Sequence, residues 1–253
     1  MDHSAYTRIV ENSDTAVLMI HGIVGSPRHF DRILPAIPDS CSVFSLLLDG
    51  HGGTVQDFSR TSMKKWKQQV DTTLQEICTQ YDKVIIIAHS MGTLLSIEAS
   101  PNYPQVKAMQ LQDVPLKVHV TPAIAIRALK LAFGRINDNN IWERTTKEAA
   151  SVKPDARLWL YLGWLPRFWE LLALCRQTRK QISSIQVPCH VFHSGRDELV
   201  SIKSAKYFRN LPLIRHEILQ QSGHLYFPQE ELAILQESAA QLISSYAGQK
   251  KGN

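Results

Sequence analysis

The sequence predicts an α/β fold in which helices cover both faces of a mostly parallel sheet. Short apolar runs alternate with stretches of helical periodicity, which is the pattern of successive β-α-β units. The run KVIII at residues 83–87 is rich in β-branched residues, as expected for a strand buried on both faces. The alternation stops near residue 115 and resumes near residue 186, so we expect one core domain with a helical insertion.

The elements of the core follow from local pattern. An apolar run at residues 17–20 ends at a glycine, so it predicts a strand that leads into a tight turn. Apolar residues recur at helical spacing over residues 61–80 and predict a helix. The other expected strands are 42–48, 83–87, 106–111, 187–193 and 217–220, and the other expected helices are 28–37, 92–100, 205–210 and 228–246. Residues 248–253 are expected to fray.

The insertion defines the expected domain organisation. We assign residues 1–114 and 186–253 to the core domain and residues 115–185 to a helical cap over the strand ends, where open α/β sheets bind ligands. The cap holds four of the five tryptophans. Trp164 and Trp169 are candidate substrate-binding residues that could line an acyl pocket. The alternative is that they form a small core of the cap itself.

Positive charge gathers in the cap. Residues 115–185 contain 12 Lys/Arg and 5 Asp/Glu, whereas the net charge of the whole chain is +5. Such a segment favours anionic substrates or surfaces, although a solvated basic face is the simpler interpretation. Basic runs with interleaved aromatic residues are missing from the sequence, so we expect no nucleic-acid partner.

The cysteines and the apolar stretches indicate the compartment. The four cysteines form no C-x-x-C pair, and the first 14 residues contain no apolar segment of the signal-peptide type. We therefore expect reduced thiols and a cytoplasmic location. The longest apolar stretch, residues 158–175, is interrupted by Pro166, Arg167 and Glu170, so we expect no transmembrane segment.

The turn IAHSMG at residues 87–92 carries the candidate nucleophile, Ser90. It lies between a predicted strand and a predicted helix, which is the setting of a nucleophile elbow. The residues two before and two after such a serine must be small, because larger side chains would collide with the neighbouring strand and helix. Ala88 and Gly92 meet this condition, although Ala88 replaces the usual first glycine. An ordinary glycine turn after a strand would give a similar pattern.

Two later strand ends supply a candidate base and a candidate acid. A neutral serine needs a base to accept its proton, and the base needs a third group that fixes its tautomer. Asp197 and His224 each follow a predicted strand and complete the chain order serine, acid, histidine. Glu198 competes with Asp197 for the role of acid. The alternative for Asp197 is a surface ion pair with Arg196, which would contribute little to stability.

The loop HGIVGS at residues 21–26 is the candidate for part of an oxyanion hole. A tetrahedral intermediate needs two backbone N–H donors where negative charge develops. The expected donors are Met91, which follows the nucleophile, and Ile23 in this loop. A purely structural tight turn is the alternative for the loop. We expect structural roles for His21 and His51, which lie in glycine turns.

Together these segments resemble the α/β-hydrolase superfamily, and within it the bacterial carboxylesterase and monoacylglycerol-lipase branch. The matching segments are LMIHGIVGSP at 18–27, LLLDGHGGT at 46–54, IIIAHSMGT at 85–93, HSGRDELV at 193–200 and QQSGHLYFP at 220–228. They occur in the order of that family, and their joint occurrence is far more specific than any single motif. Ala88 departs from the pattern, and the insertion has no counterpart that can be matched.

The resemblance implies a central eight-stranded sheet, a helical cap and ester hydrolysis without a metal or an organic cofactor. If the site roles of the family apply to the matching positions of this sequence, Ser90, Asp197 and His224 would form a catalytic triad, and Ile23 and Met91 would be the oxyanion donors. The expected substrate is a small-molecule carboxylic ester, either a short- to medium-chain acyl ester or a monoacylglycerol-like lipid.

Other functions use the same residues. An acyl thioesterase would keep the triad, and its basic cap would attract a phosphopantetheine group. A peptidase is compatible with the family. A non-catalytic, ligand-binding protein of the hydrolase fold is a hypothesis from another class, which the intact apparent triad disfavours. Dehalogenase and epoxide-hydrolase chemistry is disfavoured because those relatives have an aspartate where this chain has Ser90.

Overall fold

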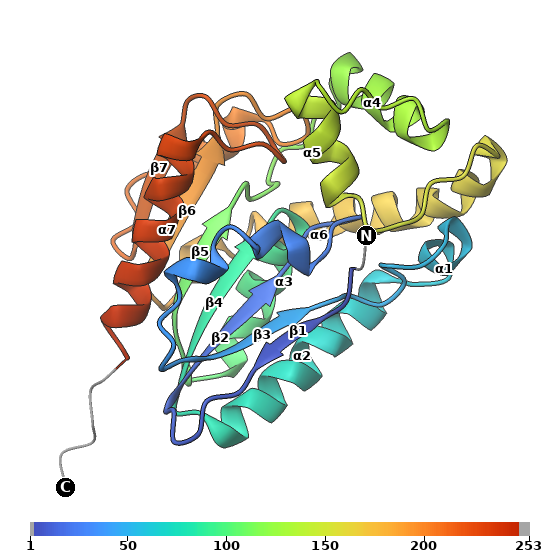
Figure 1. The fold of residues 1–253 in the computed structure, drawn as a ribbon. Helices are drawn as coiled ribbons and strands as arrows, with labels where there is room; N and C mark the ends of the chain where they lie inside the picture. Colours follow the sequence, from blue (N-terminus) through green and yellow to red (C-terminus); the bar gives the residue numbers. More distant parts are fainter. Residues whose placement is uncertain (1–2, 248–253) are drawn as a thin grey trace, which may run out of the picture.

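The computed structural model describes residues 3–247 (Figure 1). Seven strands of this part of the chain form one sheet in the order β1-β3-β2-β4-β5-β6-β7. β1 is antiparallel to β3, and all other neighbours are parallel. The predicted mostly parallel sheet with helices on both faces is therefore confirmed. The expected fraying of residues 248–253 lies outside the described residues.

The bounds of the elements are as follows. The strands are β1 (Tyr6–Arg8), β2 (Thr15–Ile20), β3 (Ser42–Leu46), β4 (Lys83–His89), β5 (Val106–Gln112), β6 (Cys189–Ser194) and β7 (Ile214–Leu219). The α-helices are α1 (Val55–Ser59), α2 (Met63–Gln80), α3 (Met91–Ala99), α4 (Pro122–Ala132), α5 (Ile141–Ala149), α6 (Leu165–Thr178) and α7 (Gln229–Ser244). Short 3₁₀ helices are η1 (Pro27–Phe30), η2 (Leu34–Ala36), η3 (Ser100–Asn102), η4 (Leu158–Trp164), η5 (Ile182–Ser184) and η6 (Ile202–Phe208).

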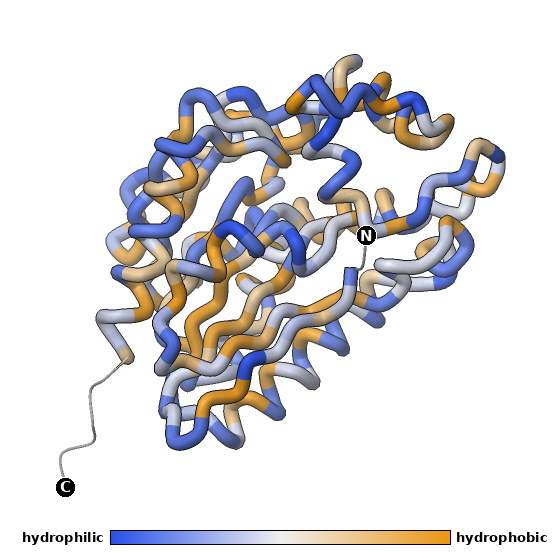
Figure 2. The backbone as a smooth tube through the Cα atoms, in the orientation of Figure 1, coloured by the Kyte–Doolittle hydropathy of each residue, from blue (hydrophilic) through white to orange (hydrophobic). Residues whose placement is uncertain are grey.

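The central strands are buried on both faces because helices cover both. Along β4, Val84, Ile86 and Ala88 pack toward α2, α3 and α6, whereas Ile85 and Ile87 pack toward α7 and the η1–η2 segment. This division follows from the two-residue period of a strand. Figure 2 shows the resulting concentration of hydrophobic residues in the middle of the sheet.

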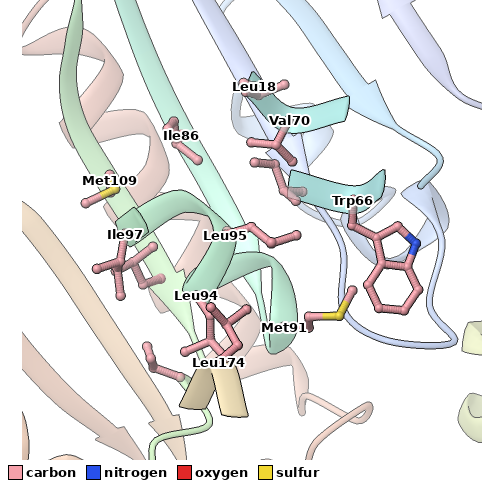
Figure 3. Packing of buried hydrophobic residues seen from close by; sticks show 14 of the residues in the cluster. Leu18, Trp66, Val70, Ile86, Met91, Leu94, Leu95, Ile97, Met109 and Leu174 are labelled. Atoms are coloured by element: carbon pink, nitrogen blue, oxygen red, sulfur yellow. The ribbon is translucent and has the colours of Figure 1, made fainter. Parts of the chain in front are cut away.

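The larger of the two cores lies between the sheet and helices α2, α3 and α6. Val70 of α2 lies beside Leu18, the Trp66 ring of the same helix lies beside Met91, and Leu94 and Leu174 meet between α3 and α6 (Figure 3). Trp66 is fully buried, and its indole N–H donates to the carbonyl of Asp49 at 2.8 Å. The aromatic side chain therefore fills the core and also holds the glycine turn that follows β3.

Three expectations about the elements need correction. Residues 3–14 contain one strand, β1. The chain then turns at residues 10–13 and enters β2 directly. The sheet of residues 3–247 therefore has seven strands, and the expectation of eight is wrong. The helix expected at 28–37 is instead η1 and η2, and a proline within η2 denies it an N–H donor. The helix turn expected at 205–210 belongs to η6.

The insertion between β5 and β6 is helical. Its helices α4 and α5 lie above the carboxyl ends of the strands (Figure 1), whereas α6 packs against α2 and α3 of the core. Leu171, Leu174 and Cys175 of α6 belong to the same buried cluster as the central strands. The boundaries of the cap at 115 and 185 stay a prediction. No helix of residues 3–247 is both long enough and apolar enough to cross a membrane.

The four cysteines are free thiols. Cys41, Cys175 and Cys189 are buried, and Cys78 is half-buried. Burial raises the pKa of Cys175 and of Cys189 to about 12 because it disfavours the charged thiolate. Burial also raises the pKa of Cys41 and of Cys78.

Candidate active site

The candidate residues come from the carboxyl ends of parallel strands in the central sheet. Ser90 follows β4, Asp197 follows β6 and His224 follows β7, and these strands occupy one half of the sheet. Ile23 follows β2, which pairs with β4 on the side opposite to β5. Residues distant in sequence meet here because the carboxyl ends of parallel strands lie at the same edge of the sheet.

Ser90 occupies a strained turn between β4 and α3. Its backbone has φ 52° and ψ −123°, a region that residues other than glycine rarely adopt. Gly92 lies so close to β2 that an added Cβ would be 2.1 Å from the carbonyl oxygen of Ile20. Ala88 lies inside the sheet with no exposed surface, so its methyl group fits at the position of the first glycine of the usual elbow motif. The local structure presents the serine above the sheet, as a nucleophile elbow does.

His224 is paired with Asp197. The His224 Nδ1 atom lies 2.7 Å from Asp197 Oδ2, and both side chains are buried. Asp197 Oδ1 accepts hydrogen bonds of 2.7 Å from the amides of Leu199 and Val200. These two amides hold the carboxylate in place, so that it fixes the imidazole tautomer with its proton on Nδ1.

The Asp197 charge controls the protonation of His224. Burial by itself would lower the pKa of His224, but the negative charge of Asp197 and its hydrogen bond outweigh burial. Asp113 and Glu198 add to this effect, and the pKa of His224 is raised to about 9. A perturbed histidine in a closed site is typical of functional positions.

Glu198, the competing acid, has a different environment. Its Oε2 atom accepts a hydrogen bond of 3.2 Å from the backbone amide of His224. Its Oε1 atom forms an ion pair with Arg127 of α4. The Glu198 carboxylate therefore contacts the backbone of the loop that carries His224 and the Arg127 side chain of the insertion, whereas Asp197 contacts the imidazole of His224.

The two backbone amides expected at an oxyanion hole are free of protein partners within residues 3–247, because neither Ile23 N nor Met91 N donates a hydrogen bond there. The Met91 side chain is buried and points toward Trp66 (Figure 3). Its amide lies at the start of α3, because Met91 is the first residue of this helix. The Ser90 hydroxyl likewise makes no hydrogen bond to a described residue. All three groups are available to a substrate.

Two histidines hold the loop that contains Ile23. His51 Nε2 accepts a hydrogen bond of 3.0 Å from Val24 N, and its Nδ1 atom contacts the carbonyl of Leu48 at 3.1 Å. His21 Nε2 accepts a hydrogen bond of 3.1 Å from Leu48 N. Burial lowers the pKa of both rings, to about 4 for His51, so neutral imidazoles fill these positions. Both residues therefore tie adjacent strand ends together.

A largely apolar cavity of about 260 Å³ opens beside these groups. The core contributes Gly22, Ile23, Val24, Gly25, His29, His89, Leu199, His224 and Leu225 to its lining, and residues of the insertion contribute the remainder. The lining residues of the insertion are Ile124, Ala128, Leu131, Ala132, Thr146, Ala149, Ala150, Val152, Pro154, Tyr161, Trp164 and Phe168. Such a cavity suits the apolar part of a ligand.

The two tryptophans proposed for substrate binding lie in different places. Trp164 lines the cavity, and its indole N–H donates to the carbonyl of Val55 at 3.0 Å. Trp169 is 66% exposed and does not line the cavity. The buried stripe of α6 contains Leu171, Leu174 and Cys175, and Trp169 lies on another face of this helix.

Sequence reasoning missed Asp113, a buried carboxyl at the same edge of the sheet. It follows β5, has φ 52°, and accepts hydrogen bonds from Ser194 N and Ser194 Oγ at 2.6 and 3.0 Å. Burial, and then the neighbouring charge of Asp197, raise the pKa of Asp113 well above its usual range. The rule that located Asp197 also applies to Asp113, because each acid lies within three residues of the end of a parallel strand.

Two more contacts at the site also escaped sequence reasoning. His29 stacks on His89 with ring centroids 3.7 Å apart, and His89 Nε2 lies 3.0 Å from the carbonyl of His224. Donor atoms of His89, Asp113 and His224 lie within 4.8 Å of one another, the spacing of a metal site. Protein groups already engage His89 Nε2 and both Asp113 oxygens, so the cluster is a hydrogen-bonded network.

A family comparison identifies the chain. The model of the family described as serine aminopeptidase, S33, matches residues 11–225. The chain belongs to this family of α/β-hydrolases. A curated relative, the thermostable monoacylglycerol lipase of Bacillus sp. (strain H-257), is 23% identical over 244 residues, which are 94% of each chain.

Solved structures share the fold of this α/β-hydrolase. One belongs to work on LipS and LipT, two metagenome-derived lipolytic enzymes; it has a TM-score of 0.72 at 17% identity and covers 96% of this chain and 98% of its own. Another is the monoacylglycerol lipase of Paleococcus ferrophilus, with a TM-score of 0.68 at 15% identity, covering 96% and 99%. The family and these likenesses support a hydrolase of the lipase and esterase type.

Proposed function

We propose that this α/β-hydrolase cleaves carboxylic esters of apolar acyl groups through a covalent acyl-Ser90 intermediate. The observation that carries the proposal is the buried 2.7 Å contact between His224 Nδ1 and Asp197 Oδ2 beside an apolar cavity. In this assignment Ser90 is the nucleophile, His224 the base and Asp197 the acid that orients it. Ile23 and Met91 supply the oxyanion hole.

Acylation begins with proton transfer. The unpartnered Ser90 hydroxyl turns toward His224 Nε2, which accepts its proton while Oγ attacks the carbonyl carbon of the ester. The electron pair of the C=O bond moves onto oxygen, where the N–H groups of Ile23 and Met91 stabilise the negative charge. Asp197 stabilises the imidazolium that forms. When the intermediate collapses, the C–O bond breaks and His224 protonates the leaving alcohol.

Deacylation repeats these steps with water. His224 takes a proton from water, and the hydroxyl oxygen attacks the acyl carbon. Collapse of the second intermediate returns the proton to Ser90 Oγ and releases the carboxylic acid.

The cavity supports an apolar acyl group as the part of the substrate that is held most closely. Its walls from α4, α5 and η4 are mainly aliphatic and aromatic. The resemblance to monoacylglycerol lipases in sequence and in fold agrees with a medium-chain acyl ester or a monoacylglycerol-like lipid.

The proposal is tested by intact mass spectrometry after incubation with a fluorophosphonate. We expect one phosphonyl adduct on the wild-type protein and none on Ser90→Ala. The same variant should lose about 10⁶-fold in kcat on p-nitrophenyl esters, the scale seen when a triad nucleophile is removed. Acyl-CoA substrates at low and high salt serve as the comparison for thioesterase activity.

The outcomes separate the hypotheses. A folded wild-type protein that takes up no adduct would contradict the catalytic assignment and favour a ligand-binding protein. Turnover of acyl-CoA that exceeds ester turnover and weakens at high salt would favour the thioesterase.

A further inference from the structure

An ion pair that is almost shielded from solvent connects the insertion to the catalytic histidine loop. The Arg127 side chain of α4 is 11% exposed, and that of its partner Glu198 is 12% exposed. The second carboxylate oxygen of Glu198 accepts the backbone N–H of His224 at 3.2 Å. A single carboxylate therefore joins a cation of α4 to the residue assigned as the base.

A second cap helix contacts the same loop. The Arg127 guanidinium lies 5.8 Å from the ring centroid of Trp142 in α5. Trp142 packs directly over Gly223, because an added Cβ at Gly223 would be 2.2 Å from the Trp142 ring. The ring centroids of Trp142 and Tyr226 are 5.0 Å apart. Helix α5 thus contacts the loop at residues 222–226 directly, and α4 is linked to it through Glu198.

Separation of Arg127 from Glu198 is energetically unfavourable. A buried carboxylate that loses its cation is left as an uncompensated charge in a poorly solvated place, which is strongly unfavourable. If α4 moved away, Glu198 would turn toward solvent and release the His224 amide. The position of α4 and the order of the histidine loop are therefore coupled through Glu198.

We propose that Arg127 is a positioning residue for His224: it acts through Glu198 to fix the histidine backbone, so that the base is fully ordered only while α4 is docked on the core. This inference rests on the proposed function, because it requires His224 to be the base.

The same helix offers a matched control. Lys130, one turn after Arg127, pairs with Glu143 of α5, and neither residue of this pair forms a hydrogen bond or an ion pair with residues 222–226. Lys130→Ala removes a cation from α4 but leaves the pair of Arg127 with Glu198 in place, and Glu143 keeps the Asn137 amide and the nearby charge of Arg127 as partners. The segment before α4 stays attached in either variant, because Thr121 N donates to the carbonyl of Glu198 at 3.1 Å.

The first experiment measures kcat and KM for Arg127→Ala, Arg127→Lys and Lys130→Ala with p-nitrophenyl acetate. An acetyl group hardly fills the acyl cavity, so its turnover reports the catalytic groups more than the pocket. We expect Arg127→Ala to lower kcat by roughly 10- to 100-fold, the scale of a small misplacement of a catalytic group, with a much smaller change in KM. Arg127→Lys should recover part of kcat, and Lys130→Ala should stay within about 2-fold of wild type.

The second experiment asks whether Arg127 acts through Glu198. In Glu198→Gln the amide still accepts from His224 N but no longer carries the charge that Arg127 pairs with. The double variant Arg127→Ala/Glu198→Gln should then have a kcat no lower than the lower of the two single variants. Losses that multiply fully, or an Arg127→Ala protein with wild-type kcat, would overturn the proposal.

Hydrogen exchange of residues 222–226 gives a readout that does not depend on turnover. We expect faster exchange of this segment in Arg127→Ala than in wild type, and no change in Lys130→Ala. Equal acceleration in both variants would mean general loosening of the cap and would overturn the proposal. If the fluorophosphonate failed to label wild type, the proposed function would fail, whereas the exchange experiment would still report the Arg127–Glu198 coupling.

Discussion

His224 is the residue whose protonation governs the proposed reaction. Only neutral imidazole can accept the Ser90 proton, and the Asp197 charge raises the pKa of His224 to about 9 despite burial. Below that pH the free enzyme holds mostly imidazolium. We therefore expect kcat/KM to rise with pH through neutrality, to reach half of its limiting value near pH 9 and to level off only above that pH, as measured with an ester that is stable in mild alkali.

Asp197→Asn provides the control for this profile. It removes the charge that does most to raise the pKa of His224, so the midpoint of the profile should move to lower pH. Its kcat should fall by about 10⁴-fold, because the imidazole loses its tautomer partner. An Asp197→Asn protein with full activity and an unchanged midpoint would contradict the assignment of the acid.

Trp164 and Trp169 form a natural pair for a test of chain-length preference. Trp164 lines the cavity, whereas Trp169 is 66% exposed. Trp164→Ala should change the ratio of kcat/KM for decanoyl and acetyl esters by about 10-fold or more, as expected when several methylene contacts are altered. Trp169→Ala should leave this ratio near the wild-type value. The opposite order would place the acyl group elsewhere.

At the scale of single residues, some placements follow from the sequence and others do not. Ser90, Asp197 and His224 could be proposed because each follows a parallel strand and their chain order is informative. Which of Trp164 and Trp169 faces the cavity could not be foreseen, because it depends on how η4 and α6 pack against the core. The contact of Arg127 with Glu198 depends in the same way on how α4 docks.

The elbow between β4 and α3 has no room for added atoms at Gly92. An added Cβ at Gly92 would be 2.1 Å from the Ile20 carbonyl oxygen, so the helix would have to move away from the sheet. We expect Gly92→Ala to lower the free energy of unfolding by about 3 kcal/mol, as overpacking does. Urea denaturation followed by circular dichroism measures this change.

Gly134→Ala is the companion variant. Gly134 has φ 63°, yet an added Cβ would meet nothing within 4 Å. Its cost should be the backbone term alone, about 1 kcal/mol. Equal destabilisation by the two variants would mean that close approach to β2 does not limit the elbow.

The helices and strands themselves were predictable to different degrees. β4 and α2 were located from periodicity, because a buried parallel strand and an amphipathic helix have distinct patterns. The helix expected at residues 28–37 failed, since a proline and short turns yield η1 and η2 instead. β1 is only three residues long and largely exposed, so it offers little hydrophobic pattern.

For the whole molecule, stability should decrease from the centre of the sheet toward the cap. β4 pairs with β2 and β5 and is almost fully buried, whereas Ile124 is the only buried residue of α4. Native-state hydrogen exchange should therefore be slowest in β4 and much faster in α4. Exchange of α4 as slow as that of β4 would show that the cap unfolds only together with the core.

The overall architecture was the most predictable level, because alternation of strands and helices leaves few topologies open. The insertion was recognised where this alternation stopped. Its packing could not be derived, since α6 joins the core whereas α4 and α5 cover the strand ends. The parts of the site that come from the insertion were hidden for the same reason.

The buried thiols have a practical consequence for chemical probes. Cys41, Cys175 and Cys189 are out of contact with solvent, and burial raises the pKa of every cysteine in the chain. Thiolates are therefore scarce at neutral pH, and electrophilic inhibitors directed at a serine meet little competition in the folded state. Conversely, a thiol reagent can modify the buried cysteines only when local or global unfolding exposes them, so the rate of modification measures how often such unfolding occurs.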